Sequence, residues 1–273
     1  MFSPFGFMGT KAGGGGDVDA DAYILAVETA GGTPTPAEKG YIQTLFTDLK
    51  TAGVYNDMFA FYPVFGGTSA THALNGIRAS GSYDLTFSGG WVHNDNGMFP
   101  NGTNAYADTG VIYGATQRNN NTYGIYVADS GSGQAYAVDG GVIRGTDYWH
   151  VCNYWSATGA GRWTNDWNDS RVATTKNGNL MVNMRNQAGN AELWSNGVDE
   201  DTLISLVGGS DTGGKSFYLG AINNDGAGAA SWSYSARGQI FSFFFRRWMT
   251  SAEMGNVSTI INDFQTSLGR NKY

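Results

Sequence analysis

The chain has 273 residues, a formal net charge of −7 at pH 7 and one cysteine, Cys152. Charged residues make up 14% of it, well below the roughly 25% of an average soluble domain. Nucleic acid and anionic lipid surfaces require clustered Lys and Arg, so we expect neither as a partner. The single cysteine excludes an intrachain disulfide. The aromatic content of 14% predicts a folded chain with a sizeable core.

Residues 1–16 join an aromatic cluster to a run of four glycines. A glycine run is a flexible tether, and bare apolar side chains on a solvated tail are a liability unless a partner covers them. One interpretation of this segment is a disordered terminus, and the other is an anchor that docks in a groove of a partner. The candidate anchoring residues are Phe2, Phe5, Phe7 and Met8.

Residues 17–53 are predicted to form a helical hairpin. Two glycines end the first helix, and Thr35 and Glu38 make a capping box at the start of the second, with Pro36 at its first position. Apolar side chains recur at helical spacing in both helices. The buried stripes are Tyr23, Ile24 and Val27 in the first helix and Tyr41, Ile42, Leu45, Phe46 and Leu49 in the second.

Residues 54–249 change to short apolar runs separated by Gly, Asn, Asp and Ser, a pattern typical of antiparallel sheets. The clearest local signal is the pair Asn196 and Gly197, because these residues supply the positive φ angles of a two-residue hairpin turn. We therefore expect β structure throughout this region. The main strand candidates are 59–65, 83–87, 123–127, 180–184 and 239–245.

Residues 250–273 are predicted to form a C-terminal helix that packs on the β region. Thr250 and Glu253 make a second capping box, and Gly269 ends the helix. The stripe expected to be buried is Met254, Val257, Ile261, Phe264 and Leu268.

Four elements follow one another in the back half of the β region: a Trp-Ser-Asn-Gly-Val hairpin from Trp194, a Tyr-Leu-Gly strand, a strand beginning Gly-Gln-Ile, and a helix beginning Thr-x-x-Glu. In the front half, segments 85–89 and 101–108 stand at the places of the first core strands. This series resembles the laminin-G-like, concanavalin A-type jelly rolls. The resemblance implies an all-β fold, a jelly-roll β-sandwich with an N-terminal helical hairpin and a C-terminal helix.

Six short motifs occur in one order along residues 19–112 and the tail. They are Asp19-Ala-Asp-Ala, Thr47-Asp-Leu-Lys, Phe61-Tyr-Pro-Val-Phe-Gly-Gly, Gly89-Gly-Trp-Val-His, the segment 100–109, and Phe264-Gln-Thr-Ser-Leu-Gly-Arg. They are similar to proteins of tailed and other bacteriophages, often of Bacteroidetes hosts, which resemble virion components such as fibres, spikes and decoration proteins. The chain departs from these proteins at residues 73–77, where a more basic run is expected.

Residues 209–216 satisfy the P-loop expression, in which backbone amides and a lysine hold phosphates. A P-loop must lead from a strand into a helix, whereas the residues after Lys215 are typical of a strand. We therefore expect a glycine-rich hairpin loop here and no nucleotide site.

Few carboxylates are placed to act as a catalytic pair. Concanavalin-like folds also host glucanases, whose retaining chemistry needs two carboxyl groups roughly 5 Å apart. Glu38 and Glu253 begin helices, Glu28 lies in the hairpin, and the acidic cluster 199–201 follows a turn and is typical of a solvated edge. The sequence therefore favours a protein that is not an enzyme.

No metal site is predicted with a defined ligand set. None of the three histidines lies at a metal-ligand spacing to another or to the cysteine. We expect no cofactor, although calcium stays possible because several aspartates lie in candidate loops. These aspartates are Asp95, Asp108, Asp166, Asp169 and Asp225.

Segments 147–155 and 162–167 are rich in tryptophan. Tryptophan faces stack on sugars and nearby Asn and Asp bind hydroxyls, so a loop with these residues suits a glycan. The alternation along 147–155 also suits a central sandwich strand, and the loop tryptophans also suit a subunit interface. The candidate carbohydrate-binding residues are Trp163, Asn165, Asp166 and Trp167.

The sequence, with its resemblances, predicts a non-enzymatic virion protein such as a spike, fibre head or capsid decoration, anchored by its N-terminus. The expected partners are other virion proteins of the capsid, penton or tail, further copies of the chain, and host surface glycans. The opening residues lack the pattern of a secretory signal, so we expect synthesis in the cytoplasm of the host bacterium and a final location in the virion. The alternatives are a carbohydrate-binding lectin module and a glycan hydrolase of the same fold.

Overall fold

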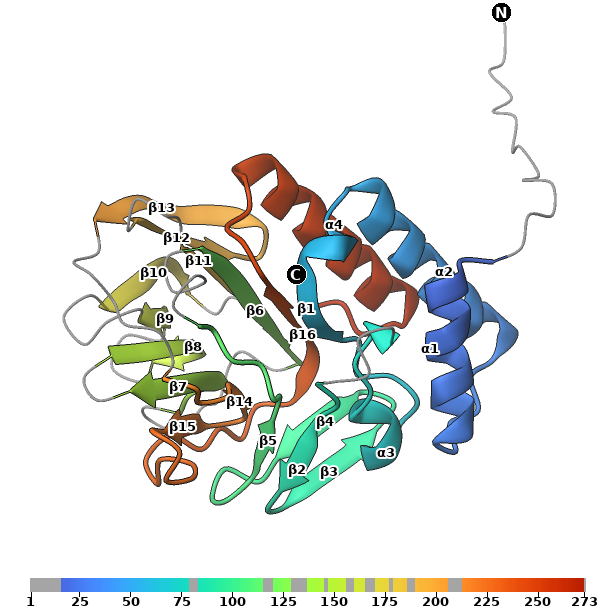
Figure 1. The fold of residues 1–273 in the computed structure, drawn as a ribbon, viewed down its shortest axis with the longest axis horizontal. Coiled ribbons are helices and arrows are strands. Elements are labelled where there is room, and N and C mark those ends of the chain that lie inside the picture. The colour runs from blue at the N-terminus through green and yellow to red at the C-terminus, as the bar shows by residue number, and fades with distance from the viewer. Residues whose placement is uncertain are drawn as a thin grey trace, which may run out of the picture.

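The structure is a computed structural model that describes residues 16–78, 83–114, 120–128, 137–144, 147–155, 160–164, 170–176, 179–185, 190–205 and 213–272. Two β-sheets lie against each other, and a layer of helices covers the outer face of one of them (Figure 1). The helices of that layer are α1 (Val18–Thr29), α2 (Pro36–Thr51) and α4 (Ser251–Ser267).

Local sequence signals set the ends of the two longest helices. In α2 the Thr35 amide donates to Glu38 Oε2 over 2.8 Å, and the Glu38 amide donates to the Thr35 hydroxyl. Thr250 and Glu253 form the same pair at the start of α4. Gly269 has a φ of 68° just after α4, a conformation in which a side chain is strained. Both predicted capping boxes are confirmed.

The first sheet, sheet A, has the strand order β13-β12-β11-β6-β16-β4-β3, and β1 also pairs with β16. Its strands are β1 (Met58–Tyr62), β3 (Trp91–Asn94), β4 (Gly97–Pro100), β6 (Asn121–Val127), β11 (Leu180–Arg185), β12 (Asn190–Ser195), β13 (Val198–Ser205) and β16 (Gln239–Phe245).

The second sheet, sheet B, has the order β10-β9-β8-β7-β14-β5-β2, with β15 parallel to β7. Its strands are β2 (Thr86–Ser88), β5 (Tyr106–Asp108), β7 (Gly140–Arg144), β8 (Asp147–Trp155), β9 (Ala160–Thr164), β10 (Ser170–Lys176), β14 (Tyr218–Leu219) and β15 (Ile222–Asn224).

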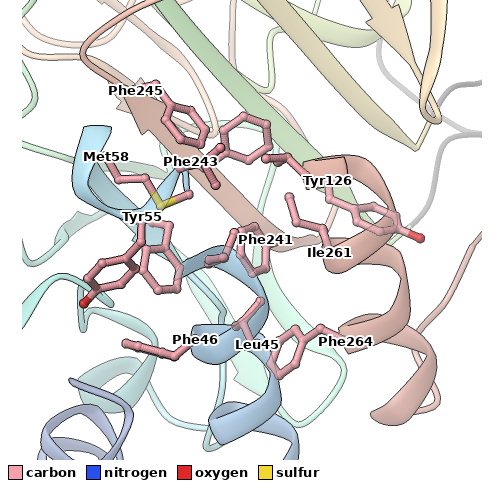
Figure 2. Packing of buried hydrophobic residues seen from close by; sticks show 14 of the residues in the cluster. Leu45, Phe46, Tyr55, Met58, Tyr126, Phe241, Phe243, Phe245, Ile261 and Phe264 are labelled. Atoms are coloured by element: carbon pink, nitrogen blue, oxygen red, sulfur yellow. The ribbon is translucent and has the colours of Figure 1, made fainter. Parts of the chain in front are cut away.

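Strand β16 lies in the middle of sheet A and has apolar side chains on both faces. Phe241, Phe243 and Phe245 face the helices, whereas Phe244 points into the core between the sheets. Figure 2 shows the helix-facing rings among Leu45 of α2 and side chains of α4. A strand buried on both faces loses the alternation of polar and apolar residues, which explains the sequence Gln-Ile-Phe-Ser-Phe-Phe-Phe.

Gly124 on β6 creates the space for one of these rings. A Cβ atom at this position would lie 2.4 Å from the ring of Phe243 and 3.0 Å from Val182. Such distances are far inside van der Waals contact, so only glycine allows the helix-facing core to pack in this way.

The predicted fold class is confirmed, because two antiparallel-rich sheets form a jelly-roll sandwich with the helical hairpin and the C-terminal helix in place. The region 54–249 is nevertheless not β throughout. It includes a 3-10 turn at Tyr55–Asp57 and the short helix α3 (Ser69–His72), which begins with a box made by Thr68 and Thr71. A single helical turn carries too few residues for its periodicity to be visible in the sequence.

The strand expected at 83–87 begins later than predicted. Tyr83 has a φ of 76°, which is incompatible with an extended strand, so β2 starts at Thr86. The hairpin predicted at Asn196 and Gly197 is present, with φ angles of 50° and 78°. None of the helices in the described ranges combines the length and hydropathy that crossing a bilayer requires.

Candidate functional site

A polar pocket of about 330 Å³ lies where the helical layer meets the sandwich. Four separate segments form its walls: the loop between α1 and α2, the chain after β1, the turn between β3 and β4, and the chain after α4. These segments come from both ends of the chain, so the pocket exists only in the folded protein.

Arg270 lines this pocket and is 4% exposed. Its guanidinium donates hydrogen bonds to three main-chain carbonyl oxygens: from Nη1 to Val64 over 2.7 Å and to Asp95 over 3.3 Å, and from Nη2 to Pro63 over 3.2 Å. Within the described residues it forms no ion pair, and its buried Nε has no acceptor. Burial lowers the pKa of Arg270 to about 10, so the group stays charged at neutral pH.

The end of α4 places Arg270 in this position. The Arg270 amide donates to the carbonyl of Gln265 over 2.8 Å, and the Gly269 amide donates to Thr266. This pattern is a Schellman motif, in which a left-handed glycine reverses the chain after the last helical turn. This reversal of the chain directs Arg270 toward the residues that follow β1.

Four side chains on the pocket wall keep hydrogen-bonding capacity. Glu38 uses Oε2 for the helix cap, whereas its Oε1 has no partner in the described part of the chain. The carboxylate of Asp95, the amide of Asn96 and the hydroxyl of Thr33 are likewise without a side-chain bond there. The wall thus offers two negatively charged acceptors, one amide and one hydroxyl.

Gly67 leaves room for the carboxylate of Asp95. A Cβ atom on Gly67 would lie 2.5 Å from Asp95 Oδ1, and Gly67 has a φ of 74° that also disfavours a side chain. Phe65, which is 4% exposed, adds an apolar surface to the same wall.

A histidine pair joins α3 to β3. Nδ1 of His72, the last residue of α3, is 3.0 Å from Nδ1 of His93 on β3. His72 is 1% exposed. Burial and the neighbouring His93 lower the pKa of His72 to about 3, and burial lowers the pKa of His93. The sequence spacing did not predict this contact.

No group of three or more His, Cys, Asp and Glu side chains could hold a metal ion in the described residues. Of the aspartates considered for calcium, Asp95 lies in the turn after β3, Asp108 ends β5, and Asp225 follows β15. Asp166 and Asp169 fall outside the described residues.

The predicted carbohydrate residues are only partly covered by the structure. Trp163 lies in strand β9 and not in a loop, where it pairs with Val151 on β8 and Arg171 on β10. The loop interpretation of Trp163 is therefore corrected, because strands on both sides hold its backbone. The remaining three, Asn165, Asp166 and Trp167, lie outside the described residues, as do the candidate anchoring residues Phe2, Phe5, Phe7 and Met8.

The rejection of the P-loop agrees with the structure around Lys215. The chain leads from a turn at residues 213–214 into strand β14 and not into a helix. A P-loop requires a helix N-terminus at the phosphate. The strand β8 predicted from 147–155 has neighbours on both sides in sheet B, so it is a central strand as expected.

The sequence matches no protein-family model and no curated protein. Among solved structures, the chain is similar to Trypanosoma rangeli sialidase, in its covalent intermediate with 2,3-difluorosialic acid (TM-score 0.52, 11% identity) and in complex with sialic acid (TM-score 0.51, 11% identity). These matches cover 82% and 81% of this chain, which spans only 39% and 38% of the sialidase chains.

A further structure is domain 4 of AbnA, a GH43 extracellular arabinanase from Geobacillus stearothermophilus, in complex with arabinotriose. It has a TM-score of 0.49 and 11% identity, and the match covers 74% of this chain and 98% of that one. At these identities the sialidase likeness establishes the sandwich fold alone.

Proposed function

We propose that this protein is a non-enzymatic, glycan-binding component of a bacteriophage virion, and that the polar pocket holds part of the glycan. The observation that carries the proposal is the set of unused polar groups on the pocket wall, from Thr33, Glu38, Asp95 and Asn96. Sugar hydroxyls both donate and accept hydrogen bonds, so they fit a wall that mixes carboxylates, an amide and a hydroxyl.

The charges favour a neutral sugar. Glu38 and Asp95 both line the pocket, whereas Arg270 donates its hydrogen bonds to main-chain carbonyls. A ligand carboxylate or sulfate would therefore meet two negative charges, while the guanidinium of Arg270 at the pocket is buried beneath the wall. The net charge of −7 acts in the same direction.

The pocket volume suits one sugar ring. Its 330 Å³ is at the small end of the range of roughly 300–1,000 Å³ for small-molecule sites. Weak single sites of this size gain strength when many copies act together, which agrees with a multivalent role on a particle. The fold likeness to a sialidase solved with sialic acid supports a glycan-related function at the level of fold.

A glycan microarray with neutral, sialylated and sulfated sugars tests the binding, followed by titration calorimetry with the best neutral glycan. We expect binding to neutral glycans and at least roughly tenfold weaker binding by Thr33→Ala/Asn96→Ala, since each lost hydrogen bond is worth about 1 kcal/mol. The matched control Thr103→Ala/Asn224→Ala changes two exposed residues away from the pocket and should bind like the parent.

Several results would contradict this assignment. Absence of binding across the array, or equal binding by the pocket variant and the parent, would remove the pocket from consideration. A loss of binding in Trp167→Ala but not in the pocket variant would place the glycan at the tryptophan-rich segment that the sequence predicts. Binding only to sulfated or sialylated sugars would refute the preference for neutral ligands.

The proposal includes no catalysis. Glu38, one of the two carboxylates on the wall, uses Oε2 to accept from both the amide and the hydroxyl of Thr35, so half of this group serves the helix cap. Hydrolysis of a bound glycan that disappears in Asp95→Asn would overturn this part and support the hydrolase alternative.

The virion setting is supported by the order of the six motifs shared with bacteriophage proteins. Mass spectrometry of purified particles tests it, and we expect the chain to be present in stoichiometric amounts. Deleting residues 1–12 should leave a folded chain that no longer enters particles. Normal incorporation of the deleted chain would refute the anchor, and absence of the full chain from particles would refute the setting.

A further inference from the structure

The contact between His72 and His93 joins α3 to β3, two elements next to segments of the pocket wall. His72 ends α3, and His93 lies on β3 with its ring 5.1 Å from that of His72, centroid to centroid. Phe87 packs edge-on against His93 at 4.7 Å, also between centroids. The pair therefore lies at an aromatic rim of the sandwich, where the His72 ring is buried and the His93 ring is half-buried.

A hydrogen bond between two ring nitrogens has room for one proton. His72 Nε2 is buried and has no hydrogen-bond partner in the described residues, so a proton there would be an unpaired buried donor. The favoured neutral form thus has the His72 proton on Nδ1, donating to Nδ1 of His93, and the His93 proton on Nε2.

Protons that bind to the His72 and His93 rings would find no negatively charged side chain paired with either ring in the described residues. Arg270, from the chain after α4, is the cation that acts on His72 besides His93. The other residues of α3 and β3 carry no charge. Asp95 follows β3 in the turn and forms no ion pair with either ring in the described residues. Charging both rings therefore places two positive charges side by side, one of them on the buried His72 ring, which water cannot solvate.

α3 and β3 also position two segments of the pocket wall. Thr71, next to His72, packs against Gly66 of the wall, where a Cβ atom would lie 2.9 Å from the Thr71 side chain. On the other side, Asp95 is two residues after His93, and its carbonyl accepts from Arg270. Movement of α3 away from β3 would displace Gly66 on one wall and Asp95 on the other.

We infer that the His72–His93 contact is an acid-sensitive latch that keeps the polar pocket formed at neutral pH and releases it in acid. The closed contact resists protonation, whereas separated rings that reach water can each bind a proton, so a falling pH favours the open arrangement. With both rings protonated, each Nδ1 carries a hydrogen and no acceptor, so the two rings repel each other and do not re-form the hydrogen bond. α3 and the β3–β4 turn then separate, and the pocket loses its two-sided wall. The inference rests on the proposed function only in that the regulated site is the glycan pocket.

Titration calorimetry with the neutral glycan selected on the array, at pH 7.5 and pH 5.0, tests the latch. We expect the parent to bind about 5- to 150-fold more weakly at pH 5.0, the usual range of coupling between two sites. His72→Asn places an amide near the Nδ1 position without a titrating ring, so its affinity should change much less. Equal affinity of the parent at both pH values, or the same pH dependence in the variant, would overturn the latch.

A second readout uses the full chain without any glycan. Ring ¹⁵N shifts measured by NMR should show the His72 proton on Nδ1 at pH 7.5, and acid should shift the backbone amides of Asp95 and Asn96 in the parent but not in His72→Asn. A failure to bind glycans with this NMR response intact would count against the proposed function and not against the latch. Unshifted amides would count against the latch alone. If His72→Asn does not fold, His93→Asn replaces it.

Discussion

Nη1 of Arg270 donates to the carbonyl oxygen of Val64 over 2.7 Å, across 206 positions of the sequence. Val64 has a φ of 48°, which is rare for a β-branched residue and costs of the order of 1–3 kcal/mol. The carbonyl of the preceding Pro63 binds the same guanidinium. The buried arginine therefore holds a strained segment of chain in the shape that forms one wall of the pocket.

Replacing Arg270 with Met should lower the free energy of unfolding by about 3 kcal/mol, because buried carbonyl oxygens lose their donors. Urea denaturation at pH 7 measures the change. The matched control is Arg78→Met, which removes a more exposed ion pair with Asp84 and should cost less than about 1 kcal/mol. Equal effects of the two substitutions would show that the guanidinium of Arg270 has no special structural role.

Acid should destabilise the fold through His72. The pKa of this ring is about 3 in the folded chain and about 6.5 in the unfolded chain. The unfolded chain therefore binds the proton first, and the stability present above pH 6.5 is lost progressively as the pH falls toward 3. At pH 5 the loss is about 2 kcal/mol.

The difference between the parent and His72→Asn isolates this contribution, because both proteins share all other titrating groups. Urea denaturation of both proteins at pH 7.5 and at pH 5.0 gives the four free energies of unfolding that the comparison needs. The parent should lose about 2 kcal/mol more than the variant over this interval. Parallel losses would mean that the buried ring does not resist protonation.

The cap of α4 should contribute a measurable share of stability. Thr250→Ala removes the hydroxyl that accepts from the Glu253 amide, and it should cost about 1 kcal/mol in thermal or urea unfolding. Thr259→Ala on the exposed side of the same helix is the control, and it should be neutral or slightly stabilising, because Ala has the higher helix propensity. A reversal of this order would contradict the capping role.

Two glycine substitutions should change the free energy of unfolding in opposite directions. Gly124→Ala forces a methyl group into the ring of Phe243 and should destabilise the fold by about 1–3 kcal/mol. Gly255→Ala, inside α4 with no neighbour within 4 Å of the new Cβ, should stabilise it by about 0.5–1 kcal/mol. Circular dichroism during urea titration compares both with the parent.

The helices and the strongest strands could be predicted because their signals are local. The boxes at Thr35 and Thr250 lie within four residues of sequence, and the hairpin at Asn196 and Gly197 needs only two residues. Position 163 differs because its environment depends on β8 and β10, which the sequence does not place beside it. Because Trp163 is close to Asn and Asp residues in the sequence, we predicted a loop there, although the residue lies in a strand that pairs on both sides.

The pocket could not be predicted for the same reason. Its walls come from segments near residues 35, 65, 95 and 270, and no short pattern relates them. Arg270 follows a glycine at a helix end, where a charged residue is normally solvated. The only trace in the sequence was the motif Phe264-Gln-Thr-Ser-Leu-Gly-Arg, which ends on this residue but gives no sign that it is buried.

The central place of β16 in sheet A has a consequence for folding during synthesis. This strand pairs with β6 on one side and with β1, about 180 residues earlier, on the other. A nascent chain interrupted before residue 239 leaves the edges of β1 and β6 unpaired and the apolar face of α2 without its phenylalanines. Contacts between such distant segments form slowly, and open edges invite aggregation. The ribosome-bound chain therefore exposes these strand edges and this apolar helix face until β16 and α4 emerge.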